Sequence, residues 1–85
     1  MSDLDQRFEK AQEDVKGLSS RPGNDELLEL YALFKQGTEG DVSGKRPGMT
    51  NFKGRAKFDA WKDKVGMGGD EAKEAYVSLV ERLLS

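Results

Sequence analysis

The sequence predicts an all-α protein, a four-helix bundle with one long connection between its second and third helices. Apolar residues recur every three or four positions in four stretches of the chain, which is the spacing of amphipathic helices. No stretch shows the alternation of apolar and polar residues that is typical of a half-buried β-strand. Glycine and proline gather between the four stretches, where they end helices and form connections. Together these three observations favour helices packed side by side.

The first helix is predicted by a single apolar stripe. Its members are Leu4, Phe8, Ala11, Val15 and Leu18. Acidic residues lie early in this stretch and Lys16 lies late, which suits the helix dipole. Gly17 weakens the end of the helix, and residues 19–23 form the connection that follows.

The second helix is predicted to follow Asn24, a good N-cap residue, and to end at Gly37 and Gly40. It carries two neighbouring stripes. The stripe expected in the core consists of Leu27, Leu30 and Phe34. The other stripe consists of Leu28, Tyr31 and Lys35, which places an aromatic ring and an ammonium group one turn apart on one face.

Residues 40–50 contain three glycines and a proline and are predicted to form a long loop. The third helix begins after Thr50 or Asn51 and runs to about residue 64. We expect Phe58 and Trp61 to anchor this helix in the core. Lys53 and Lys57, at i and i+4, share a different side.

The fourth helix is predicted to start near residue 70, after the glycines at positions 66, 68 and 69. Two acidic residues occupy its first turn, which suits the helix dipole. The side expected to be buried consists of Ala72, Tyr76, Val80 and Leu83. Tyr76 has small or polar neighbours along the chain, so it fits a core position and a ligand-contact position equally well.

The composition restricts the chemistry that this chain can perform. Eighty-five residues correspond to one small domain, covering residues 1–85. The chain has no cysteine and no histidine, which excludes the usual zinc sites and catalytic triads. We therefore expect no enzymatic activity, no metal and no cofactor. The polar N-terminus is unlike a signal peptide, and no apolar run could span a membrane, so we predict a cytoplasmic protein without stable membrane insertion. We also expect a monomer.

The charge is distributed unevenly along the chain, although the formal net charge is only −2. Residues 35–64 hold eight basic and four acidic residues, a local charge of +4, whereas the other positions hold six basic and twelve acidic residues. Aromatic residues lie among these cations. This pattern favours an anionic partner that also carries a flat ring.

Two other interpretations use the same cations. A helical protein-interaction module, or a nucleic-acid-binding module, would present the basic face of residues 35–64 to its partner. The net acidity and the single localised cluster argue against nucleic acid. A purely structural interpretation also exists, because a basic cluster can be a solvated helix face and Tyr31 can be a core or rim residue.

Several motifs resemble the acyl-CoA-binding protein family over nearly the whole chain. They are Tyr31 with Phe34-Lys35-Gln36, Gly40-Asp41, Arg46-Pro47-Gly48, Phe52-Lys53-Gly54-Arg55-Ala56-Lys57-Phe58 and Asp59-Ala60-Trp61. The resemblance implies a four-helix bundle that binds medium- to long-chain fatty acyl-CoA thioesters one to one without catalysis. It further implies roles in transport and lipid metabolism as an acyl-CoA carrier and pool former, with acyl-CoA-using enzymes as further partners. The chain has Gly37 where the family commonly has alanine.

The resemblance also implies roles for individual residues. Tyr31 stacks on adenine, and Lys35 and Lys57 hold the ribose 3′-phosphate with help from Lys16. Lys53 lies along the nucleotide phosphates, and Tyr76 packs beside adenine and pantetheine. The residues of the family's binding segment that lie between Tyr31 and Lys35 are Ala32, Leu33 and Phe34. Leu28 is a weaker candidate for the acyl groove.

Overall fold

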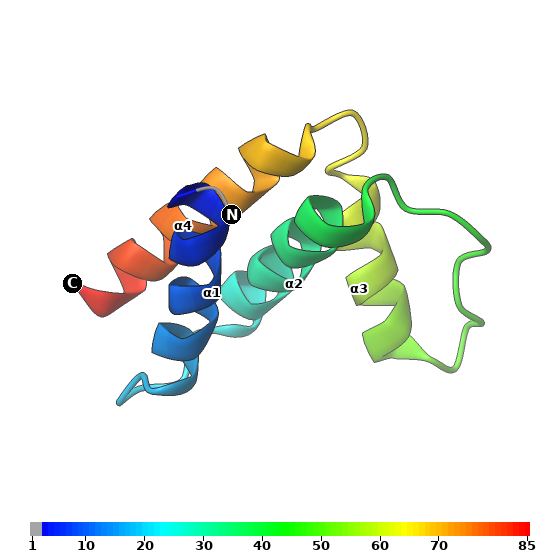
Figure 1. Cartoon of the computed structure of the whole chain (residues 1–85). Helices are drawn as coiled ribbons and strands as arrows, with labels where there is room; N and C mark the ends of the chain where they lie inside the picture. The colour runs from blue at the N-terminus through cyan, green and yellow to red at the C-terminus, as the bar shows by residue number, and fades with distance from the viewer. Residues whose placement is uncertain (1–2) are drawn as a thin grey trace.

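The computed structural model describes residues 3–85, so that Met1 and Ser2, which entered the argument about the N-terminus, lie outside the described residues. Four helices follow one another: α1 (Asp3–Lys16), α2 (Asn24–Glu39), α3 (Phe52–Lys62) and α4 (Gly69–Leu84). No strand occurs between residues 3 and 85. The predicted all-α class is thus confirmed, and the long connection lies between α2 and α3 as expected (Figure 1).

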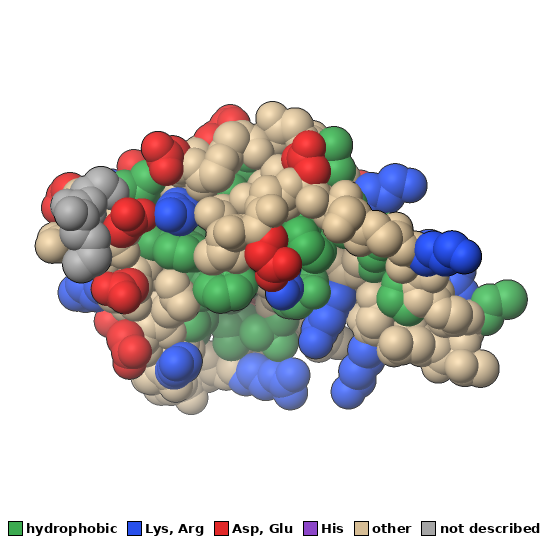
Figure 2. Space-filling model, turned by 45° about the vertical axis from the view of Figure 1, so that its right-hand side comes forward, with side chains coloured by type: hydrophobic (Ala, Val, Ile, Leu, Met, Phe, Trp, Pro, Cys, Tyr) green, Lys and Arg blue, Asp and Glu red, His purple; other side chains and the backbone are tan. Residues whose placement is uncertain are grey.

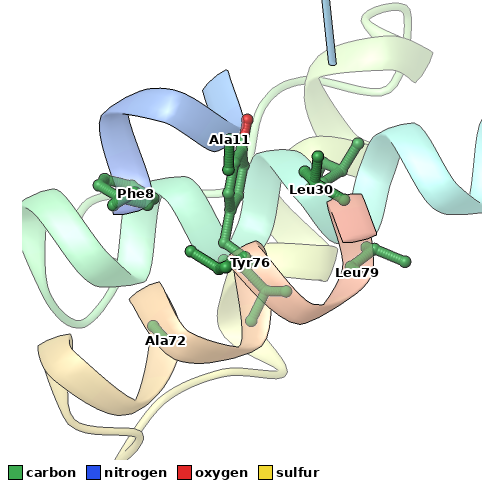
Figure 3. Close-up of a cluster of buried hydrophobic side chains, with 9 residues drawn as sticks. Phe8, Ala11, Leu30, Ala72, Tyr76 and Leu79 are labelled. Atoms are coloured by element: carbon green, nitrogen blue, oxygen red, sulfur yellow. The ribbon is translucent and has the colours of Figure 1, made fainter. Parts of the chain in front are cut away.

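The four helices do not contribute equally to the buried core. α4 packs against both α1 and α2, whereas α3 packs against α2. The core cluster accordingly comes from α1, α2 and α4, and consists of Phe8, Ala11, Leu30, Leu33, Ala72, Tyr76, Val77, Leu79 and Val80. Figure 3 shows Tyr76 reaching from α4 toward Ala11 of α1, between Phe8 and Leu30.

α3 lies at the edge of the bundle, which corrects the expectation for its two aromatic residues. Phe58 and Trp61 are half-buried, and α3 has no fully buried residue. The reason is that α3 has a packing partner on one side only. Trp61 still anchors the helix, because its indole Nε1 donates a hydrogen bond to the carbonyl oxygen of Gly40 over 2.8 Å.

The helix ends differ in detail from the predicted boundaries. The N-cap of α2 is Gly23 rather than Asn24, and the Glu26 carboxylate accepts a hydrogen bond from the Gly23 amide over 3.1 Å. Asn51 is confirmed as the N-cap of α3, since its Oδ1 accepts from the Gly54 amide over 3.0 Å. α3 ends at Lys62, about two residues earlier than predicted, and a turn of residues 63–66 follows.

The connection between α2 and α3 is held at its start and at its middle by carboxylates. At its start, Asp41 Oδ1 accepts from Gln36 Nε2 over 2.8 Å and from the Gly66 amide over 2.9 Å. At its middle, Arg46 forms a two-pronged ion pair with Asp59 of α3, with distances of 2.9 and 2.6 Å. These bonds fix how the connection leaves α2 and how it approaches α3.

Candidate functional site

A groove of about 420 Å³ runs between α2 and α3. Its lining residues are Arg21, Asn24, Leu27, Leu28, Tyr31, Phe52, Lys53, Ala56 and Lys57. Apolar side chains from both helices dominate this lining, and the charged residues in it are all cations. The groove therefore suits a ligand with an apolar part and a negatively charged part.

Tyr31 is the centre of the polar end of this site. The Nζ of Lys57, on α3, lies 5.3 Å from the centre of the Tyr31 ring. The Nζ of Lys35, one turn further along α2, lies 6.0 Å from the same ring and 5.7 Å from the ring of Trp61. Both ammonium groups are within the range of a cation–π interaction. An aromatic face with two adjacent cations can hold a flat ring beside a phosphate.

A second hollow of about 320 Å³ adjoins the groove on the other side of α2. It is lined by Val15, Lys16, Pro22, Leu27, Leu30, Tyr31, Phe34 and Tyr76. Tyr31 and Leu27 line both hollows, so the two hollows adjoin at these side chains. Lys16 and Tyr76, which are distant from Tyr31 in sequence, are in this way brought to it, beside Phe34 of the same helix.

Tyr76 serves the core as well as this hollow. Only 5% of the residue is exposed, and its ring meets the Phe8 ring edge-on with 5.1 Å between centroids. Burial raises the pKa of the Tyr76 hydroxyl. The two interpretations that the sequence left open for Tyr76, core and site, therefore do not exclude each other.

Two of the predicted site residues point elsewhere. Ala32 is 0% exposed and Leu33 is 2% exposed, so their side chains support α2 from inside rather than line either hollow. The remaining candidates except Lys35, Leu28 and Lys53 among them, line one or the other of the two hollows. Lys35 lines neither hollow, but it lies beside them because its ammonium group contacts the ring of Tyr31.

Sequence reasoning missed several residues of the groove. Arg21 belongs to the connection after α1, and no periodicity places the side chain of a loop residue. Phe52 and Ala56 had a usable signal, because they are spaced i, i+4 on α3 and directly precede Lys53 and Lys57. Phe52 is 76% exposed, which is unusual for a large apolar side chain beside a groove.

Charge is also separated on the surface. Figure 2 shows Lys and Arg side chains mainly along the lower edge and the right-hand side, whereas Asp and Glu side chains gather mostly on the left and upper parts. Among residues 3–85, no group of three or more acidic, histidine or cysteine side chains is placed to hold a metal ion. No helix in the same part of the chain is long and apolar enough to cross a membrane.

These features define a helical binding protein with a cationic, aromatic site that continues into an apolar groove. The family model of the acyl-CoA-binding proteins, "Acyl CoA binding protein", matches residues 5–80. The chain belongs to this family.

Individual relatives agree in sequence and in structure. The chain is 54% identical over 78 residues to acyl-CoA-binding protein homolog 1 of Caenorhabditis elegans, covering 92% of this chain and 91% of that protein. It is 48% identical over 81 residues to the acyl-CoA-binding protein of Brassica napus, covering 95% of this chain and 88% of that protein. The crystal structure of Oryza sativa acyl-CoA-binding protein 2 superposes with a TM-score of 0.90 at 42% identity, covering 95% of this chain and 90% of that one.

Proposed function

We propose that this protein binds medium- to long-chain fatty acyl-CoA one to one and acts as a cytoplasmic, monomeric carrier and pool former that does no chemistry on its ligand. Residues 1–85 would act as a single acyl-CoA-binding domain, and acyl-CoA-using enzymes would exchange ligand with it. The observation that carries the proposal is that Tyr31, with Lys57 beside its ring, lines the apolar groove between α2 and α3. Membership of the family supports the ligand class.

The cations around Tyr31 suit the head of this ligand. Coenzyme A carries about four negative charges near neutral pH, from one phosphomonoester and one diphosphate. We assign the 3′-phosphate to Lys35 and Lys57, with Lys16 assisting, and the diphosphate to Lys53. Each charge-assisted contact would contribute about 1.5–3 kcal/mol before ordering costs. Lysine suits phosphates approached from several directions, because it acts as a point charge.

The aromatic and apolar residues suit the rest of the ligand. Tyr31 would stack on adenine, with Phe34 and Tyr76 bordering the same hollow. The acyl chain would lie in the groove along Leu28, where each methylene removed from water contributes about 0.8 kcal/mol. Ala32 and Leu33 would hold α2 in place behind the site. Because only the thioester has an acyl chain to place in the groove, we expect it to bind more tightly than free coenzyme A.

Isothermal titration calorimetry with dodecanoyl-CoA and with free coenzyme A tests the proposal. We expect one site per chain for dodecanoyl-CoA and a Kd at least about 100-fold lower than for coenzyme A, because several methylenes leave water. Equal affinity for the two compounds, or no binding of the thioester, would refute the proposed function. A mobility shift with single-stranded RNA at physiological salt distinguishes the nucleic-acid alternative.

A further inference from the structure

Lys35 is the cation of the Tyr31 site that is already engaged by a carboxylate. Its Nζ lies 2.5 Å from Oε2 of Glu39, one turn further along α2. Among the described residues, the structure shows no ion pair for Lys16, Lys53 or Lys57. The hydrogen bond to Glu39 is the main reason why the pKa of Lys35 is raised. A phosphate that uses Lys35 must therefore either share its ammonium group with a carboxylate or displace that carboxylate, which the other three lysines do not require.

Helix stability gives little reason for this pair. Glu39 is the last residue of α2, where a negative charge is disfavoured by the helix dipole. The order of the pair is also the weaker one, since a glutamate four residues before a lysine stabilises a helix better than the reverse. Because 54% of the Glu39 side chain is exposed, the pair stabilises the fold only slightly. What Glu39 does affect is the ligand site, because it holds a lysine that contacts the Tyr31 ring.

We infer that Glu39 is a specificity-determining residue, which competes with the ligand's 3′-phosphate for Lys35 and so lowers the affinity for 3′-phosphorylated ligands. The inference rests on the proposed function. A phosphomonoester carries about 1.5–2 negative charges and three acceptor oxygens, so it outcompetes a single carboxylate. Glu39 then returns to water at little cost, because its side chain is more exposed than that of Lys35, which is 28% exposed.

The cost of the exchange falls only on ligands that use Lys35. A ligand without the 3′-phosphate leaves the pair between Lys35 and Glu39 intact and is not penalised. Removing the carboxylate must therefore widen the difference in affinity between the two kinds of ligand. The worth of an exposed pair corresponds to about a two- to fivefold change in Kd. Such a change would appear mainly as slower release, since affinity differences at one site lie mostly in the dissociation rate.

A calorimetric comparison of two ligands and three proteins tests this inference. The ligands are dodecanoyl-CoA and 3′-dephospho-dodecanoyl-CoA, and the proteins are the wild type, Glu39→Gln and Glu81→Gln. Glutamine keeps the shape of the side chain and removes its charge. Glu81 is exposed near the far end of α4 and lines neither hollow around Tyr31, so Glu81→Gln controls for net charge.

We expect Glu39→Gln to lower the Kd for dodecanoyl-CoA by about two- to fivefold and to leave the Kd for the 3′-dephospho ligand unchanged. Glu81→Gln is expected to change neither. Unchanged or weaker binding of dodecanoyl-CoA by Glu39→Gln would overturn the inference, and so would equal tightening of both ligands. If neither the wild type nor Glu39→Gln binds dodecanoyl-CoA, the proposed function itself falls, and this inference falls with it.

Discussion

At the scale of single residues, Lys57 connects the two walls of the site. It projects from α3 and approaches the ring of Tyr31 on α2, with 5.3 Å between its Nζ and the ring centre. It also lines the groove, together with Lys53 one turn earlier. Lys57 thus lies beside the ring proposed to stack on adenine, and its loss should affect binding more than the loss of a cation from the same helix that lies outside the site.

We predict that Lys57→Ala weakens binding of dodecanoyl-CoA by at least about tenfold, because a charge-assisted contact to phosphate is worth about 1.5–3 kcal/mol. Lys62→Ala is the matched control, since Lys62 lies on the same helix, is exposed and lines neither hollow. Calorimetry should show a change of less than about twofold for the control. Similar losses in both variants would mean that only net charge matters.

At the scale of elements, two helical glycines differ in how much space an added methyl group would find. A Cβ at Gly37, on α2, would lie 3.0 Å from Cγ of Lys73, which is part of a flexible side chain. A Cβ at Gly54, on α3, would lie 2.5 Å from Nδ2 and 2.9 Å from Oδ1 of Asn51. Lys73, whose Nζ donates to Asp5 over 2.8 Å, has to give way by only a few tenths of an ångström, whereas the Asn51 side chain caps α3 and would have to leave its place.

The same substitution should therefore have opposite effects at these two positions. Alanine is favoured over glycine inside a helix by about 0.8–1.0 kcal/mol, so Gly37→Ala should raise the free energy of unfolding by about 0.5 kcal/mol after Lys73 has adjusted. Gly54→Ala should lower it by about 1 kcal/mol, because displacing Asn51 costs more than the helix gains. Urea unfolding measures both values. Stabilisation by both variants would show that the Asn51 cap contributes nothing.

Element identity was readable from the sequence to a large extent. The spacing of Phe8 and Ala11 in α1, and of Ala72 and Val80 in α4, predicted buried faces that the structure confirms. Helix type follows from local periodicity, and no distant part of the chain is needed to recognise it. The choice between neighbouring cap residues was less secure. Gly23 replaces Asn24 as the cap of α2, because the Glu26 side chain satisfies the Gly23 amide.

At the scale of the whole molecule, Asp41 links parts that are far apart in the sequence. Its Oδ1 accepts from Gln36 on α2 and from the amide of Gly66, in the turn before α4. Gln36 is 1% exposed and also donates to the carbonyl oxygen of Met67 over 2.9 Å. This network holds the end of α2, the long connection and the turn after α3 together. It therefore helps to fix α3 against α2, where the groove lies.

The network makes stability depend on acid pH. The hydrogen bond from the Gly66 amide, with that from Gln36, lowers the pKa of Asp41. A carboxylate with a lowered pKa in the folded state contributes stability that is fully present above its unfolded pKa of about 3.9 and is lost as the pH falls through the folded pKa. Asp41→Asn should therefore be less stable than the wild type at neutral pH, and this difference should shrink below about pH 4.

Urea unfolding of both proteins over a series of pH values measures this difference. A gap that narrows toward acid pH is the expected result, since protonation removes from the wild type the charge that the variant never has. A gap of constant size at all pH values would show that the ionised state of Asp41 does not contribute.

The candidate site was only partly readable from the sequence. Tyr31 and Lys35 lie one turn apart on one helix, so local spacing was enough to pair them. Lys16 and Tyr76 were assigned through resemblance to a family, and their place beside Tyr31 depends on the packing of α4 against α1 and α2. Arg21 was not predicted, since a loop side chain has no periodic pattern.

The sequence by itself determined the four helices, the buried faces of α1 and α4 and the long connection, because these depend on interactions between residues a few positions apart. Only the tertiary structure decided that α3 packs against α2 at the edge of the bundle, with Phe58 and Trp61 half-buried. It also decided that a groove lies between these two helices and that Lys64 pairs with Glu29 of α2. The groove's shape depends on how whole helices fit against one another, and a side chain's choice of partner depends on which groups surround it in the fold. Neither is encoded in spacing along the chain.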